Sequence, residues 1–185
     1  MTLRGWIEVG FAAALLTAVG CSSNGGSGSS APGFVCSDGG AAGSNGVTMT
    51  CGGATAATTE QVDVVMGGPA SGSTTLRGLN FDVVYDPAKL GFMPAASYTS
   101  PLFPGALIAV ALYNGQPGRV VVTIQQTGGT PDVAVASGQH DVLKLTFQGA
   151  AGVNFSPTPV VFANPEATTP SASVSFASAL ALSYQ

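Results

Sequence analysis

The sequence predicts an all-β protein, an antiparallel β-sandwich of about nine strands. Two observations carry this prediction: from residue 60 onward apolar residues alternate with polar ones, and glycine, proline, asparagine or aspartate interrupts the alternation at short intervals. A third is that no segment after residue 20 has a sustained helical period with caps at its ends, which argues against parallel βαβ units. Two sheets that each have one apolar face can bury those faces against each other without helices.

Composition limits the protein to one domain with little ionic chemistry. The chain has 185 residues, only 8% of them charged, and a net charge of −4, whereas about 25% charged residues is typical of globular proteins. Five basic residues provide no stripe to neutralise phosphates, so nucleic-acid binding has no electrostatic basis. One histidine, three cysteines and scattered carboxylates leave little material for a metal cage or a catalytic triad. We therefore predict no metal and no cofactor.

Residues 1–20 form an export signal. Arg4 and the free amine precede an apolar run from Val9 to Val19, which is shorter than the roughly 20 residues that span a bilayer. The run ends in Ala18-Val19-Gly20 before Cys21, which resembles the lipobox of bacterial lipoproteins. The resemblance implies that Cys21 is lipidated and that the protein is anchored to the bacterial cell envelope, at the outer membrane or the cell surface. The alternative is an ordinary secretory signal with a free Cys21.

The rest of the chain divides into a linker and one domain. Residues 21–33 are the lipidated cysteine and a flexible Gly/Ser linker, and residues 34–185 are the single β-sandwich domain. Within the domain, Cys36 and Cys51 remain as an even pair in an exported chain, which most simply forms a disulfide. The loop between them consists of turn-forming residues. A metal site is the weaker interpretation, because two cysteines without a nearby histidine lack four ligands.

The expected strands are, in order, 61–66, 76–86, 106–113, 119–126, 141–148, 159–163 and 173–182. Alternation places one set of side chains in the core: Val62, Val64, Met66, Leu79, Phe81, Val83, Tyr85, Val120, Val122, Ile124, Leu143, Leu145 and Phe147. Their neighbours, among them Asn80, Asp82, Thr123 and Gln125, are expected to point outward. All prolines after residue 60 except Pro159 are expected between strands, where a missing N–H breaks no ladder.

The segment from Leu79 to Leu90 contains an alternating strand, then Tyr85-Asp86-Pro87, then a leucine that returns to the core. Asp86 can cap a turn in which Pro87 has a fixed φ. This segment resembles the cohesin signature, and 138–147 resembles the cohesin strand that follows a glycine-led turn. The resemblance spans about residues 55–183. It implies a nine-stranded jelly-roll sandwich, related to cellulose-binding module families two and three, and a non-catalytic module that binds a protein partner.

In cohesins the partner is a dockerin, a calcium-loaded helical module that attaches enzymes to a scaffold for polysaccharide breakdown. We expect the partner-binding face on the outward side of two strands: Gly78, Asn80, Asp82, Val121, Thr123 and Gln125. The chain departs from the family here, because Gly78 and Asn80 stand where many dockerin-binding cohesins have asparagine and then aspartate. The partner is therefore a dockerin-like module or another envelope protein.

The sequence leaves two other functions open. A carbohydrate-binding module needs aromatic rings that stack on sugars, and Tyr98 and Tyr113 are the candidates, although they can equally cover the sandwich edge. The second is a purely structural envelope lipoprotein. Catalysis is the least favoured class: His140 lies beside Asp141 at an expected turn without a nucleophile, and Asp82 and Asp86 would be about 13 Å apart along a strand, too far for a glycosidase pair. We predict that the chain is not an enzyme.

Overall fold

A computed structural model describes residues 33–169 and 173–185. The predicted signal, Cys21 and almost all of the linker lie outside these ranges. Residues 31–185 form one compact unit, which holds all described strands and the core. In the described ranges, no helix has the length and hydrophobicity needed to cross a membrane. The elements are β1 (Phe34–Ser37), β2 (Gly46–Ala56), β3 (Thr59–Gly67), β4 (Ser73–Leu76), β5 (Gly78–Val84), β6 (Leu90–Met93), β7 (Leu107–Leu112), the 3-10 helix η1 (Tyr113–Gly115), β8 (Arg119–Gln125), β9 (Val133–Ala136), β10 (Gln139–Gly149), β11 (Phe155–Thr168), β12 (Ser175–Ala177) and β13 (Leu180–Tyr184).

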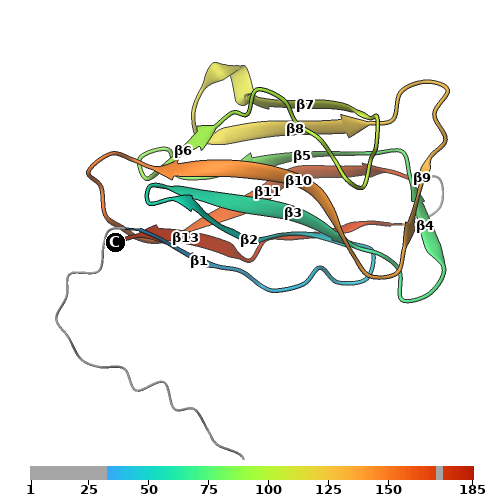
Figure 1. Ribbon diagram of the computed structural model, residues 1–185, viewed down its shortest axis with the longest axis horizontal. Helices are drawn as coiled ribbons and strands as arrows, with labels where there is room; N and C mark the ends of the chain where they lie inside the picture. Colours follow the sequence, from blue (N-terminus) through green and yellow to red (C-terminus); the bar gives the residue numbers. More distant parts are fainter. Residues whose placement is uncertain (1–32, 170–172) are drawn as a thin grey trace, which may run out of the picture. The chain divides into compact units, whose positions relative to one another are not determined.

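The strands form two large sheets and one small one (Figure 1). The six-stranded sheet has the order β1-β13-β11-β5-β8-β7, and the five-stranded sheet has the order β12-β2-β3-β10-β6. Strands β4 and β9 pair only with each other and lie together at one end of the larger sheets (Figure 1). All pairs are antiparallel except β12 with β2, which is parallel. The predicted all-β sandwich is confirmed.

The core lies between the two large sheets and includes every residue that alternation placed there. All thirteen predicted inward side chains are buried, and most of them are fully inaccessible to solvent. Aromatic rings join the sheets, because Tyr85 next to β5 contacts Phe147 of β10 edge to face at 5.3 Å between ring centroids. Period-two hydrophobicity therefore predicted the core correctly.

The structure has more strands than expected, because β1, β2, β6 and β9 were not predicted and because two predicted strands are each divided. The predicted strand 76–86 becomes β4 and β5, which belong to different sheets. At the break, the backbone N–H of Arg77 donates a hydrogen bond to Thr168 O at the end of β11. The Arg77 carbonyl accepts one from Gln126 N, just after β8. The predicted strand 173–182 becomes β12 in the five-stranded sheet and β13 in the six-stranded sheet. Between β12 and β13 the chain therefore crosses from the five-stranded sheet to the six-stranded sheet and connects the two at the margin of the sandwich.

The prediction that nearly all prolines lie between strands is wrong for Pro157 and Pro165, which lie inside β11. Both are at irregularities of the ladder. The register of β11 shifts between Phe155 and Thr158 against β13, and between Ala163 and Glu166 against β5. A bulge leaves a residue unpaired, so a proline there removes no required hydrogen bond.

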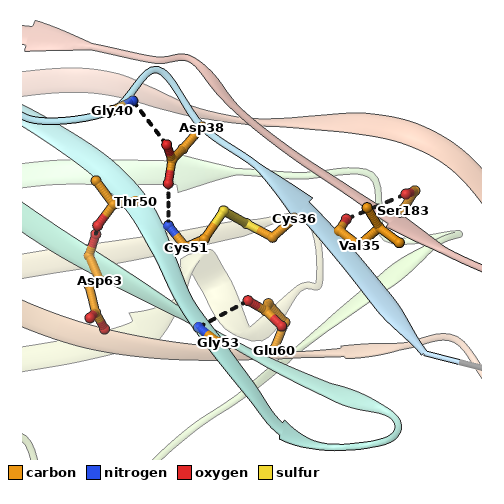
Figure 2. Close-up of a disulfide and its surroundings, with 10 residues drawn as sticks. All are labelled: Val35, Cys36, Asp38, Gly40, Thr50, Cys51, Gly53, Glu60, Asp63 and Ser183. Carbon is orange, nitrogen blue, oxygen red and sulfur yellow. Dashed lines mark hydrogen bonds between the residues drawn. A yellow bond between two sulfur atoms is a disulfide. The ribbon is translucent and has the colours of Figure 1, made fainter. Parts of the chain in front are cut away.

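The predicted disulfide is present and joins β1 to β2 (Figure 2). Its sulfur atoms link Cys36 and Cys51, whose Cα atoms are 5.9 Å apart. Asp38 closes the same loop, since one carboxylate oxygen accepts a hydrogen bond from Gly40 N at 2.9 Å and the other from Cys51 N at 2.7 Å. The disulfide and Asp38 therefore fix the otherwise irregular segment between the first two strands.

Candidate functional site

The six residues predicted to bind a partner are brought together as three facing pairs. In the ladder between β5 and β8, Gly78 lies opposite Gln125, Asn80 opposite Thr123, and Asp82 opposite Val121. Directly opposite residues point to the same side of a sheet, and the residues between them point into the core. We call these six residues the β5–β8 face. It lies in the middle of the outward side of the six-stranded sheet.

Asp82 departs from the prediction, because it is on the outward side but only 5% exposed. Its Oδ2 atom accepts hydrogen bonds from Arg119 Nε at 2.9 Å, from Arg119 Nη2 and from Asn164 Nδ2 at 2.7 Å. The Arg119 guanidinium in turn lies over the Tyr113 ring, 4.2 Å from its centroid. A carboxylate that is paired in this way offers little net charge to a partner. The charge at this end of the β5–β8 face is neutralised within the chain.

Gly78 fills a position at which a side chain does not fit. A Cβ atom on Gly78 would lie 2.4 Å from the carbonyl oxygen of Ile124, and 3.3 Å from the Cα atom of Gln125. The obstacle is backbone of β8, which cannot rotate away as a side chain can. The packing of β5 against β8 therefore leaves room only for glycine at this position.

Two flanking strands extend the β5–β8 face with residues that the sequence did not indicate. On β7, Leu107 lies opposite Gln125, Ala109 opposite Thr123, and Ala111 opposite Val121, and all three are exposed. Leu107 is 65% exposed, which is unusual for a leucine in a strand. The result is an apolar border along one side of the face.

On the other side, Glu166 of β11 lies opposite Asn80 and is exposed. It forms no ion pair or side-chain hydrogen bond within the described part of the chain. An unpaired carboxylate is therefore present next to Asn80. The signal for Glu166 was weak, because Pro165 suggested that the strand had already ended.

The two candidate glycan-stacking tyrosines lie against strands of different sheets. Tyr98 lines a hollow with Lys144 and Thr146 of β10, and its hydroxyl accepts a hydrogen bond from Ala95 N at 2.9 Å. Tyr113 follows β7 and stacks on Arg119 of β8. Each ring thus has a packing role of its own, and the stacking of both on one sugar chain stays a prediction.

A hollow of about 690 Å³ lies beside His140 and Asp141. His140 was expected in a turn, but it is the second residue of β10. Its side chain is half-buried, with Nε2 2.9 Å from Ala136 O. Asp132, also in the lining, is paired with Arg77 at 2.9 Å. The described lining contains no serine or cysteine, and the described residues hold no cluster of three metal-ligating side chains.

The turn after β5 forms as its sequence indicated. Asp86 Oδ1 accepts a hydrogen bond from Ala88 N at 3.0 Å, and the Asp86 carbonyl accepts from Lys89 N and Leu90 N. Leu90 then begins β6 with its side chain buried. This turn carries the chain from the six-stranded sheet to the five-stranded sheet and holds the end of β5 in place.

No family model matches the chain, and no curated protein matches it either. Several solved protein structures, in contrast, are similar to this chain. The sixth cohesin of scaffoldin B from Acetivibrio cellulolyticus, in complex with a dockerin variant, superposes with a TM-score of 0.53 at 17% identity, over 73% of this chain and 95% of that one. A type I cohesin from Clostridium thermocellum, also in a complex with a dockerin, superposes with a TM-score of 0.50 at 12% identity, over 74% of this chain and 91% of that one.

This chain has the cohesin fold. At 12–17% identity, the similarity shows a shared arrangement of strands. The predicted resemblance to cohesins is therefore confirmed for the fold. Both solved cohesins span almost their whole length on this chain, so the cohesin sandwich accounts for most of the described residues. Within this sandwich the β5–β8 face combines Gly78, Asn80 and the internally paired Asp82.

Proposed function

We propose that the chain is a non-catalytic protein-binding module and that its partner docks on the β5–β8 face. The observation that carries this proposal is the alignment of three facing pairs on the outward side of one sheet. Asn80, Val121 and Thr123 are half-buried there, Gln125 is exposed, and the only charged side chain, Asp82, is buried and paired within the chain. The cohesin fold supports it, because the two solved cohesins described above are bound to dockerins. A dockerin-type module is the first candidate, and another envelope scaffold protein is the second.

The chemistry of the face limits the partner. Asn80, Thr123 and Gln125 offer hydrogen bonds from amides and a hydroxyl, whereas Val121 and Leu107 offer apolar contact. The unpaired carboxylate of Glu166 is the one ionic group next to Asn80. A complementary surface would therefore be apolar and hydroxyl-rich, with one cation placed opposite Glu166. Recognition of this kind depends on shape and hydrogen bonds more than on net charge.

The test is titration of residues 31–185 with each dockerin module encoded by the same organism, by calorimetry, with calcium and with a chelator. We expect saturable one-to-one binding in calcium, and loss of it in the chelator when the partner is a dockerin. Thr123→Arg should abolish binding because a long cation replaces a small hydroxyl at the centre of the face. Asn80→Ala should weaken binding by about twofold to tenfold, through loss of a hydrogen bond worth about 0.5–1.5 kcal/mol.

Thr146→Arg is the matched control, because Thr146 is also half-buried and also points outward, but from the five-stranded sheet. Undiminished affinity in Thr123→Arg would remove the β5–β8 face as the docking site. Failure of every dockerin to bind would leave the second class of partner, for which the same variants serve as probes in cross-linking to envelope proteins.

We further propose that the protein is exported and held in the cell envelope through a lipid on Cys21. The disulfide between Cys36 and Cys51 supports export, because such bonds persist in oxidising compartments. Metabolic labelling of the full chain with a radioactive fatty acid should yield a labelled membrane-bound protein, and Cys21→Ser should be unlabelled. A wild-type protein without label, released as a soluble form, would show an ordinary secretory signal.

A further inference from the structure

Strand β7 forms an open edge of the six-stranded sheet. Its only ladder is with β8, where six consecutive residues pair without a register shift. No other backbone hydrogen bond of the described residues involves 107–112. In an antiparallel pair, every second residue directs its N–H and C=O away from its neighbour. β7 therefore presents a regular row of unpaired backbone donors and acceptors.

This edge lacks the features that normally prevent strands from pairing between molecules. Such features are charges, prolines, bulges and short length. The chain has no charged residue from Leu90 to Gly118, and β7 itself is entirely apolar, Leu-Ile-Ala-Val-Ala-Leu. The other outermost strands of the two large sheets, β1, β6 and β12, have only four, four and three residues. β1 is also bound to β2 by the disulfide.

We propose that β7 pairs antiparallel with β7 of a second copy of this chain. The strand is complementary to itself. With a two-fold axis through Val110, Ile108 of one copy faces Leu112 of the other on the inner side, and Ala109 faces Ala111 on the outer side. Ile108, Val110 and Leu112 are half-buried at the margin of the core, so a second copy would complete their burial. The two small alanines let the backbones approach without obstruction.

A second copy fits this edge better than an unrelated strand because the apolar pattern reads nearly the same in both directions. A two-fold contact places the same residues on both sides, and because β7 has no charged residue, no like charges meet across the axis. The dimer would join two six-stranded sheets into one continuous sheet and leave both outward faces free. This inference does not depend on the proposed function, but it would present two β5–β8 faces side by side and so allow bivalent binding.

The test is sedimentation equilibrium of residues 31–185 from about 1 μM to about 1 mM. We expect the average mass to rise from one chain to two as the concentration increases. The double variant Ala109→Lys with Ala111→Lys places like charges directly opposite across the axis and should weaken association by at least about tenfold. Ala54→Lys with Ala56→Lys is the matched control, because these alanines are also exposed and two apart on a strand, at the far end of β2.

Hydrogen exchange locates the contact in the wild-type protein. The amides of residues 107–112 should exchange more slowly as the concentration rises, while those of β1 should not change. A mass of one chain throughout would overturn the proposal, as would association that is equally strong in the β7 double variant and in its control. Association with protection outside β7 would also overturn it, since a different surface would then form the dimer.

Discussion

The outward sides of the two large sheets differ in how they handle charge. On the five-stranded sheet, Lys144 faces Asp63 with 3.2 Å between Nζ and Oδ2, and the lysine side chain is 53% exposed. On the six-stranded sheet, the Asp82 side chain is only 7% exposed beneath Arg119 and Asn164. The first pair is an ordinary solvated one, whereas the second withdraws its carboxylate from solvent. The low surface charge of the β5–β8 face therefore has two causes: the face has few charged residues, and its one carboxylate, Asp82, is paired with Arg119 within the chain.

The two sides also differ in how tightly their backbones pack. At Gly78 of β5 the nearest atoms to an added Cβ belong to the backbone of β8. At Gly52 of β2 they are the ends of two side chains, Asp63 Oδ1 and Gln61 Nε2, both at 2.7 Å. A side chain at Gly78 would therefore require the backbone to shift, whereas one at Gly52 would require only the Asp63 and Gln61 side chains to move.

The largest difference in stability should come from removing the cation of each pair. Arg119→Ala leaves the buried carboxylate of Asp82 with Asn164 as its only donor, so we expect a loss of about 2–3 kcal/mol in unfolding free energy. Lys144→Ala on the other sheet should cost less than about 1 kcal/mol, because exposed pairs contribute little. Urea unfolding of both variants measures this. Equal costs would show that Asp82 is solvated in the same way as Asp63.

The next difference should come from the two glycines. Gly78→Ala forces the backbone of β5 away from β8, and we expect a cost of about 1–3 kcal/mol. Gly52→Ala should cost less than about 1 kcal/mol, because the Gln61 and Asp63 side chains can move aside. The same urea experiment measures both. A neutral Gly78→Ala would show that the contact between β5 and β8 is looser than described.

The smallest effect should be a pH dependence that distinguishes two buried carboxylates. Asp82 is paired with the Arg119 guanidinium. Glu60, near the start of β3, is 3% exposed, and in the described part of the chain its carboxylate accepts a hydrogen bond only from Gly53 N, at 3.2 Å (Figure 2). Burial raises the pKa of Glu60, the bond from Gly53 opposes this, and the nearby Asp63 adds to the rise.

A raised folded-state pKa means that the folded chain binds the proton more tightly than the unfolded chain. Stability should therefore fall as pH rises from the usual glutamate range through the folded pKa of Glu60. Glu60→Gln keeps an oxygen for Gly53 and should remove this dependence, so that the variant unfolds at a higher temperature than the wild type at neutral pH. Thermal unfolding profiles that remain parallel from acid to neutral pH would contradict this assignment.

The sequence predicted what depends on local alternation. The thirteen side chains that alternation placed inward are all buried, and the disulfide and the turn at Asp86 were also identified, but Val142 of β10, which is fully buried, was missed. Facing pairs on the β5–β8 face followed as well, because outward positions of two neighbouring strands must lie on one side of the sheet. These features arise from the period of a strand and from turn chemistry.

The rest could not be predicted because it depends on neighbours that are distant in the chain. β7 is apolar at every position, so period two could not show that Leu107 points outward. The burial of Asp82 depends on Asn164, which is 82 residues away. Glu166 was missed because a proline next to it suggested a loop, whereas a bulge accommodates that proline within β11.

The most direct test of the central claim is a hydrogen-exchange footprint of residues 31–185 with and without a saturating protein partner. The account predicts that bound partner slows exchange in β5 and β8, with weaker protection in β7 and β11, and leaves β3 and β10 unchanged. Protection concentrated on β3 and β10 would place the partner on the charged side of the five-stranded sheet. That result would contradict the assignment of the β5–β8 face as the docking site.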